Sequence, residues 1–398
     1  MSVQRGTPWG FLFRRGVFLI LDLLLLLPLI LLAAVSRFFP RPIDVGLGPT
    51  PIINAPRHKE ALLAAGYTAE TFVDSVWYIT DEFDFRADLR LPGVLGVLRP
   101  YILFVRSLFR YRCIYTYFSG GSLRTTSLLY WAEALLLQLA GIKSVIMPFG
   151  SDVQDLTLSP NRIFVARMAR DYPTHRFLRT RIRRSVAAWS FFADHIIAGA
   201  DWVDYLAYWD TLMVSHFAIN TVQWSPRLSE AAGSRGLHIA HAPNHRAIKG
   251  TEALIRAVEE LKSEGVPVEL SLMEGRPNHE IRQLIADADV VVDQLVVGWY
   301  AMFAIEAMSM GKPVICYLRE DLRRLYVTEG LLGENEPPLI NADLLSVKET
   351  LRGLARDRSH FAEIGRAGRD YVERRHSLRA IGAVFDRINR SLGLAPRQ

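Results

Sequence analysis

The sequence contains few of the residues that build disulfide or metal frameworks. Only two cysteines, Cys113 and Cys316, occur among 398 residues, and each falls in a stretch that is typical of a buried strand. This scarcity argues against a disulfide framework or a metal cluster and favours a reducing compartment. The sequence also lacks the patterns CxxC, HExxH and GxxxxGK[ST], so it has no motif for a redox dithiol, a zinc protease or a P-loop.

Lysine is also scarce. Six of the 47 basic residues are lysine and the rest are arginine, and the formal net charge is +6. Arginine binds oxyanions bidentately, so its excess suits phosphate groups or anionic lipid. A biased genome composition would give the same excess. Hydrophobic residues make up 50% of the chain and charged residues 22%, and the length is sufficient for two globular domains.

Charge is nearly absent from Gly16–Ser36, a run of 21 residues in which Asp22 is the only charged side chain. A helix of this length spans roughly 30 Å, the thickness of the hydrocarbon core of a bilayer. Three interpretations compete: a cleaved signal peptide, a spanning anchor, and a kinked helix that enters one leaflet. The length of the run argues against the signal peptide, and the weak arginine asymmetry around it sets no topology. Asp22 and Pro28 suit the kinked helix. We expect membrane attachment.

The rest of the chain alternates between short buried strands and helices, which predicts parallel α/β sheets. The expected strands are Ile43–Gly46, Thr71–Val76, Cys113–Tyr117, Lys143–Met147, His195–Ala198, Leu237–Ala240, Val268–Met273, Ala288–Val292 and Val314–Tyr317. The expected helices are Ile53–Ala65, Arg99–Arg112, Leu128–Leu139, Ala200–Trp209, Thr251–Glu264, His279–Asp287, Ala301–Met310 and Arg374–Leu392. Small and polar residues in Ser225–Gly236 predict a linker between two halves.

One strand–loop–helix–strand unit, Asp293–Tyr317, organises the second half. Ligands of parallel sheets bind at the carboxyl ends of strands, against helix N-termini. Glu306 falls inside the otherwise apolar helix of this unit, so its carboxylate needs a partner. That partner is either a ligand or, if Glu306 lies on the solvated side, a cap or salt bridge within the protein.

A second candidate site lies in His241–Gly250, between a strand and a helix. Arg246 and Lys249 precede the helix, and two cations beside helix-terminal N–H groups would hold a diphosphate. The alternative is two surface cations in a loop. In the first half, Gly46 and Gly48 follow the first strand, where they either let a ligand approach the backbone or form a plain tight turn.

Basic residues gather in Arg162–Arg184, which has nine basic positions. They form either a solvated helical face or a polybasic surface for anionic headgroups. No nucleic-acid recognition motif accompanies them, so no nucleic-acid partner is expected. Asp152 ends the sequence Gly150-Ser151-Asp152 after a predicted strand, where the simplest role of its carboxylate is to cap a helix.

The string from Gly298 to Ile315 has the pattern GxxxxxxxEAMxxGKPVI. It resembles the donor-site motif of retaining GT-B glycosyltransferases of the group 1, family-4-like set. The resemblance covers about Asp44 to Leu392 and is strongest in Leu237–Tyr317. It implies an α/β fold in which two Rossmann-like domains face one cleft. Together with the apolar N-terminus, it predicts a membrane segment at 1–40, an acceptor domain at 41–225, a nucleotide-sugar donor domain at 237–375, and a C-terminal helix at 376–398 that crosses back to the first domain.

The resemblance also implies roles for individual residues. Glu306 would hold the ribose hydroxyls of a nucleotide-sugar, while Arg246 and Lys249 match the Arg…Lys-Gly pair that binds donor phosphates. Asp152 matches a strand end that often faces the acceptor. The other implied donor-binding positions are Gly46, Gly48, Gly250, Gly298, Trp299, Tyr300, Ala301 and Met302.

The family has a second Glu, which contacts the sugar, where this chain has Gly298. We therefore expect the sugar to be held by backbone N–H groups of Trp299–Met302 or by the Trp299 and Tyr300 rings. We also expect Gly298→Glu to change donor preference more than stability.

The implied activity is transfer of a hexosyl group, with retention of configuration, from a nucleotide-diphosphate sugar to a lipid-linked or cell-envelope glycan. Cations of the protein would replace a metal ion, and no cofactor is expected. The apolar segment would hold the protein at a membrane, with its catalytic domains in the cytoplasm. Two alternatives remain. A sugar-nucleotide epimerase shares the fold but is normally soluble. A non-catalytic GT-B-like subunit that binds a partner glycosyltransferase is supported by Gly298.

Overall fold

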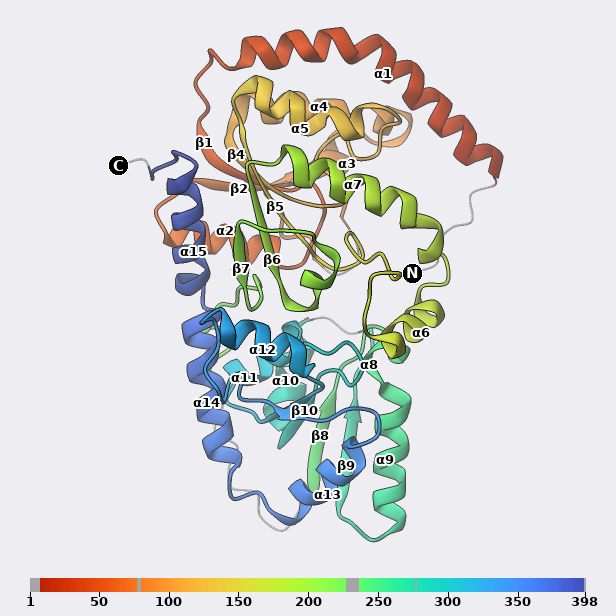
Figure 1. Cartoon of the computed structure of the whole chain (residues 1–398), viewed down its shortest axis with the longest axis vertical. Helices are drawn as coiled ribbons and strands as arrows, with labels where there is room; N and C mark the ends of the chain where they lie inside the picture. The colour runs from red at the N-terminus through yellow and green to blue at the C-terminus, as the bar shows by residue number, and fades with distance from the viewer. Residues whose placement is uncertain (1–7, 77–79, 227–235, 276–277, 397–398) are drawn as a thin grey trace.

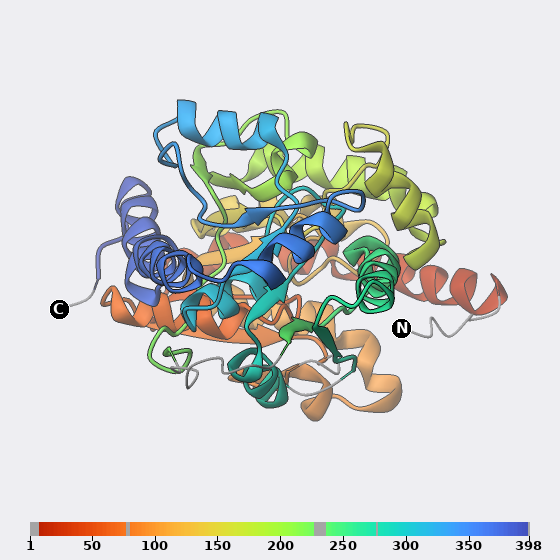
Figure 2. The same ribbon diagram turned by 90° about the horizontal axis from the view of Figure 1, so that it is seen from below.

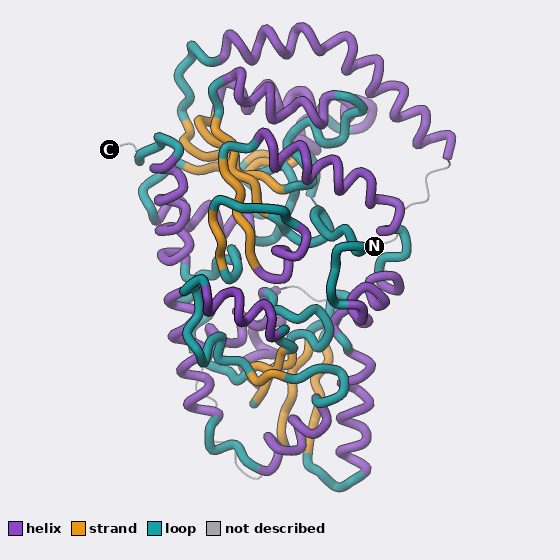
Figure 3. Tube along the Cα trace, in the orientation of Figure 1, coloured by secondary structure: helices purple, strands orange, loops and turns teal. Residues whose placement is uncertain are grey.

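The computed structural model describes residues 8–76, 80–226, 236–275 and 278–396. Most of the predicted linker, Ser225–Gly236, lies outside the described residues. Two separate groups of strands, each surrounded by helices, follow one another along the long axis of the molecule (Figure 3). The expected α/β class is confirmed.

The first sheet has seven parallel strands in the order β3-β2-β1-β4-β5-β6-β7. Its strands are β1 (Ile43–Leu47), β2 (Ala69–Val73), β3 (Phe85–Arg86), β4 (Tyr111–Tyr117), β5 (Lys143–Met147), β6 (His195–Gly199) and β7 (Thr211–Met213). The helices of this half are α1 (Pro8–Ser36), α2 (Ala55–Ala64), α3 (Ala87–Arg90), η1 (Gly93–Leu98), α4 (Arg99–Arg110), α5 (Leu129–Ala140), α6 (Arg162–Asp171), η2 (His175–Leu178), α7 (Arg179–Phe192) and η3 (Ala200–Tyr205).

The second sheet has five parallel strands in the order β12-β11-β10-β8-β9. Its strands are β8 (Leu237–His241), β9 (Val268–Leu272), β10 (Val290–Val292), β11 (Val314–Cys316) and β12 (Ile340–Asn341). The helices are α8 (Arg246–Lys249), α9 (Thr251–Ser263), α10 (Asn278–Asp287), α11 (Met302–Ser309), α12 (Glu320–Thr328), α13 (Val347–Arg356), α14 (Phe361–Arg375) and α15 (Leu378–Ser391). Figure 2 shows helices on both faces of this sheet.

Strands β10 and β11 are apolar along their whole length, as expected for strands that helices cover on both faces. All three residues of β10 and of β11 are buried. The expected helix at Ala200–Trp209 is instead a short 3-10 turn, η3, which ends at Tyr205. The remaining predicted strands and helices are present, and their ends shift by a few residues.

The last helix, α15, packs against α2 of the first half rather than against the second sheet. Tyr115 of β4 donates its hydroxyl to Asn389 Oδ1 at 3.0 Å, and Tyr67 donates to Asp386 at 2.8 Å. The preceding helix, α14, packs against α11 of the second half. The C-terminal segment therefore joins the two halves a second time.

A glycine permits the close approach of α15 and α2. A Cβ atom on Gly382 would overlap with the carbonyl oxygen of Ala61. We expect Gly382→Ala to lower the free energy of unfolding by about 1–3 kcal/mol, because the helices must move apart. Chemical denaturation followed by circular dichroism measures the change.

Gly353 in α13 is the matched control, because a Cβ atom there meets nothing within 4 Å. Gly353→Ala should stabilise the protein by about 0.5–1 kcal/mol. Equal effects of the two substitutions would contradict the packing argument.

Candidate functional site

A buried ion pair lies at the carboxyl ends of β8 and β10, in the second half. Lys249 Nζ is 2.7 Å from Asp293 Oδ1, and neither side chain is more than 11% exposed. The second oxygen of Asp293 accepts the N–H of Ala301 at 2.8 Å, directly before α11. Asp293 therefore holds both Lys249 and the start of the helix that carries Glu306. Lys249 is thus a buried residue of the site rather than a surface cation.

Glu306 lies on the first turns of α11, and only 7% of the residue is exposed. Burial and the nearby Asp293 carboxylate raise its pKa to about 8, although Lys249 acts in the opposite direction. Among the described residues, none forms a hydrogen bond or ion pair with its carboxylate. A buried carboxyl group without a partner is costly, so this position is poised for a ligand that can supply hydroxyl groups.

Glu306 contributes to the wall of a cavity of about 300 Å³ between the two halves. Asn54 and Arg57 come from the first half, while Arg282 and Met302 come from the second. Trp224, at the end of the first half, completes an aromatic part of the lining. The cavity therefore offers charged, amide and aromatic groups to one ligand.

The side chain of Arg246 is paired at the surface in this structure. Its guanidinium forms ion pairs of 2.8 Å with Glu252 and 2.9 Å with Glu274, both at the surface. Each of the two cations that the sequence predicts for a diphosphate thus already has a carboxylate partner.

Helix α6 and the segments beside it cover the loops where the sequence places donor phosphates. Asp171 accepts the N–H of Ile248 at 2.9 Å, so a protein carboxylate lies where a phosphate oxygen is predicted. Asn161 donates its side-chain amide to the carbonyl oxygens of Val296 and Val297 at 2.7 and 3.1 Å. An apolar cluster that includes Ile248, Val296, Phe164 and Met168 fills the space between these contacts. The first half therefore contacts both predicted donor loops.

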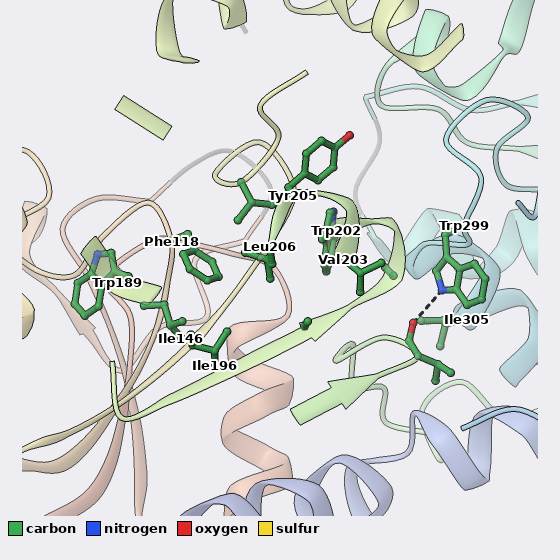
Figure 4. Close-up of a cluster of buried hydrophobic side chains, with 14 of the residues drawn as sticks. Phe118, Ile146, Trp189, Ile196, Trp202, Val203, Tyr205, Leu206, Trp299 and Ile305 are labelled. Carbon is green, nitrogen blue, oxygen red and sulfur yellow. Dashed lines mark hydrogen bonds between the residues drawn. The ribbon is translucent and has the colours of Figure 1, made fainter. Parts of the chain in front are cut away.

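The rings of Trp299 and Tyr300 are buried between the halves, with 0% and 2% of each residue exposed. Trp299 donates Nε1–H to the carbonyl oxygen of Val214 at 2.9 Å (Figure 4). The Tyr300 hydroxyl lies 2.7 Å from the hydroxyl of Tyr371 and 2.9 Å from His376 Nε2. Both rings fill the core that joins the halves, so their predicted contact with a sugar stays a prediction. Figure 4 shows that this core continues to Phe118 and Trp189 of the first half.

The side chain of Arg319 occupies the space beside Gly298. A Cβ atom on Gly298 would lie 2.6 Å from Arg319 Cδ, and the φ angle of +97° favours glycine. Arg319 itself forms ion pairs with Asp204 of the first half and with Asp321. The sequence predicts that Gly298→Glu changes donor preference more than stability; since the substitution would displace Arg319, we expect a loss of stability as well.

Three further predicted positions, Gly46, Gly48 and Asp152, have structural roles in this arrangement. A Cβ atom on Gly46 would lie 2.6 Å from the Tyr111 ring, and one on Gly48 would overlap with the carbonyl oxygen of Phe72. These glycines are required by packing within the first sheet. Asp152 begins no helix: its Oδ1 accepts the N–H groups of Phe149 and Gly150 at 3.0 Å, and burial raises its pKa to about 7.

Sequence reasoning missed three residues of this region: Asp293, Asp171 and Arg319. Asp293 carried a signal, because it directly follows the buried strand β10, where ligand-binding side chains of parallel sheets are found. Asp171 and Arg319 act across the boundary between halves, and no local pattern in the sequence marks such partners.

Comparisons with known proteins give no match at the level of sequence. No family model and no curated protein matches the chain. Solved structures do match its fold. Sucrose-phosphate synthase from Thermosynechococcus elongatus is 15% identical with a TM-score of 0.56, and the match covers 88% of this chain and 98% of that chain.

Two further structures have similar scores. HepE of Anabaena, solved in complex with UDP, is 12% identical with a TM-score of 0.55, and the match covers 88% of this chain and 100% of that chain. WaaG, a glycosyltransferase involved in lipopolysaccharide biosynthesis, is 12% identical with a TM-score of 0.53, and the match covers 86% of this chain and 98% of that chain. At such low identity, similarity carries the fold and not the function. The chain therefore has the GT-B fold, in which two Rossmann-like halves face each other.

Proposed function

We propose that the protein is a membrane-associated glycosyltransferase that moves a sugar from a nucleotide-diphosphate sugar to a lipid-linked or cell-envelope glycan. The position of Glu306 is the main support for this proposal. Its carboxyl group has no partner among the described residues and lines a cavity of about 300 Å³ between two halves of a GT-B fold. A ribose would supply the hydroxyl groups that this carboxyl group lacks.

Two solved structures of the same fold support a nucleotide donor. HepE was solved with UDP, and an α-glucosyltransferase with UDP-glucose, at TM-scores of 0.55 and 0.53.

The proposed reaction breaks the bond between the anomeric carbon and the phosphate oxygen and forms one to the acceptor oxygen. The acceptor hydroxyl proton passes to the leaving phosphate if configuration is retained, as the sequence resemblance implies. Lys249, once released from Asp293, would stabilise the negative charge that develops on the diphosphate. Arg246 would have to leave Glu252 and Glu274 to assist it. In this scheme the protein supplies the cations, and no metal ion is invoked.

A second candidate function is a non-catalytic GT-B-like subunit. The observations that favour it are the ion pairs of Lys249 and Arg246 and the Asp171 carboxylate at Ile248 N–H. Together they occupy the groups that a diphosphate would need. The two functions differ in whether a nucleotide diphosphate displaces these partners.

Calorimetric titration separates the two functions. We expect one nucleoside diphosphate among UDP, GDP and ADP to bind the full-length protein, and Glu306→Gln to weaken binding by about 1–2 kcal/mol through the lost hydrogen bonds to the ribose. Glu329→Gln, an exposed exchange on the same half, should bind as the wild type does. Absence of binding for all three nucleotides would favour the subunit.

Asp171 provides an independent test of the diphosphate position. Asp171→Ala removes the carboxylate that accepts the N–H of Ile248, so we expect diphosphate affinity to rise by about three- to tenfold. Tyr172→Phe is the control, because it removes the neighbouring hydrogen bond to His245 but no charge. If both variants bind the diphosphate more tightly by the same factor, the cause is weaker packing of α6. Competition between the Asp171 carboxylate and a phosphate for the Ile248 N–H is then excluded.

A further inference from the structure

Helix α1 is built into the fold of the first half. Figure 1 shows it bending over α4 and α5, at the end of the molecule farthest from the second sheet. It is the one helix among the described residues that is long and apolar enough to cross a membrane, over Arg15–Ser36. Its contacts decide whether it can do so.

The buried charge of α1 serves as a cap for α5. Asp22 Oδ2 accepts the N–H groups of Ser127 and Leu128 at 2.8 and 2.6 Å, at the N-terminus of α5. Asp22 Oδ1 accepts the hydroxyl of Tyr101 at 2.7 Å. A carboxylate at this end complements the helix dipole, so Asp22 is satisfied only while α1 lies against α5.

The other end of α1 is held by Arg41. Its guanidinium donates to the carbonyl oxygens of Leu108 in α4 at 2.9 Å, Ala140 in α5 at 2.6 Å and Ser36 in α1 at 3.4 Å. One arginine thus satisfies the C-terminal ends of three helices. Between the two polar contacts, Leu29 and Ala33 are buried on the same face of α1.

The opposite face of α1 is exposed and apolar. Ile20, Leu23, Leu24 and Leu27 each leave more than 60% of the residue exposed. The apolar surface continues on α5, which packs beside α1. Its exposed apolar residues are Trp131, Leu135 and Leu139, and Leu128 directly before the helix is exposed as well. Apolar surface of this extent marks an interaction site.

Arginines border this surface at one end. Ser127 Oγ donates to the carbonyl oxygen of Arg15 at 2.9 Å, and Arg181 donates to that of Arg124 at 2.7 Å. The segment before α5 therefore contacts both α1 and the first turn of α7. Arg176 in η2 and Arg184 in α7 are exposed on the same segment of the chain as Arg181. Neither forms an ion pair with a carboxylate of the described residues. An apolar face next to unpaired arginines complements an anionic lipid leaflet.

We propose that the surface formed by α1, α5 and the start of α7 docks on one leaflet of an anionic membrane, with α1 lying along the membrane rather than across it. A spanning α1 would have to leave α5, which would carry Asp22 into the hydrocarbon and strand the N–H groups that it caps. In the docked position the same helix offers its apolar face to lipid without breaking a contact. The proposal does not depend on glycosyl transfer.

Depth measurements with the full chain in phosphatidylglycerol-containing vesicles test the orientation. Ile20→Cys, Leu27→Cys and Leu31→Cys each place a spin label on the exposed face, while the native Cys113 and Cys316 are buried. Ile20 and Leu31 are about 16 Å apart along the helix axis. We expect the three labels to lie within about 5 Å of one depth. A label depth that increases or decreases steadily from position 20 to position 31, or that is greatest at Leu27, would indicate a spanning helix and overturn the proposal.

Charge reversal tests the arginine border. Arg176→Glu/Arg184→Glu should lower partitioning onto these vesicles at least roughly fivefold. The control Arg256→Glu/Arg356→Glu makes the same change of net charge at exposed positions of α9 and α13 and should bind as the wild type does. Equal losses of partitioning in both double variants would overturn the assignment of the arginine border. If the protein instead forms a dimer without detergent and does not bind the vesicles, a second copy covers the apolar face and the proposal is wrong. Glu306→Gln should dock normally, so failure of the proposed activity is distinguished from failure of docking.

Discussion

Substitution of Lys249 by methionine is expected to destabilise the protein by about 3–5 kcal/mol, because it leaves the Asp293 carboxylate buried without its partner. Lys249 Nζ and Asp293 Oδ1 are 2.7 Å apart, and the Asp293 side chain is fully buried. Methionine keeps most of the length and volume of the lysine stem, so the loss reports the charge rather than a cavity. Urea denaturation at neutral pH measures the change.

The double substitution Lys249→Met/Asp293→Asn separates folding from function. Asparagine keeps a carbonyl oxygen that accepts the N–H of Ala301, as Asp293 does now, and removes the unpaired charge. We therefore expect the double variant to recover to within about 1 kcal/mol of the wild type.

Binding by the double variant then tests the role of Lys249 directly. If the lysine binds the donor diphosphate, the stable double variant should still lose about 1.5–3 kcal/mol of nucleotide-diphosphate affinity, as for other hydrogen bonds to charged groups. Calorimetric titration at the same pH gives the value. Wild-type affinity in a stable double variant would mean that the Lys249–Asp293 pair is purely structural and that other groups hold the diphosphate.

The sequence predicts the sheets well because their strands are short and buried on both faces. Runs such as Val290–Val292 and Val314–Cys316 have no polar residue that would allow another placement. It predicts Glu306 for a related reason: one carboxylate in an apolar helix needs an explanation. Both predictions rest on residues that are close together in the sequence. The structure has buried strands at these runs and a buried Glu306 in α11.

Contacts between distant segments account for what the sequence does not predict. Asp22 suggests a kinked helix when α1 is considered alone, but its partners Tyr101 and Leu128 lie 79 and 106 residues away. From its place in the sequence, Trp299 is expected to contact a ligand. In the structure its ring N–H donates to the carbonyl oxygen of Val214 on the other half. The partner of each polar group decides its role, and pairing across halves follows from topology rather than from the residues nearby.

Glu306→Gln is expected to make the protein more stable at neutral pH while it weakens nucleotide binding. Burial and Asp293 raise the pKa of Glu306 to about 8, so the folded state resists ionisation of this carboxyl group. In the unfolded chain it ionises near its ordinary pKa of about 4.3. Below about pH 4.3, Glu306 is protonated in both states and does not lower the free energy of unfolding. As the pH rises from about 4.3 to 8, ionisation in the unfolded chain alone lowers the free energy of unfolding of the wild type.

The stability difference between Glu306→Gln and the wild type should follow that window. It should be small near pH 4, grow by at most about 1.4 kcal/mol per pH unit, and level off above pH 8 at roughly 2–5 kcal/mol. Urea denaturation of both proteins across this range measures it. A constant difference would show that the pKa of Glu306 is the same in the folded and the unfolded protein, which contradicts the raised pKa. A variant that gains stability and loses nucleotide affinity has the signature of a binding site that is maintained at the expense of stability.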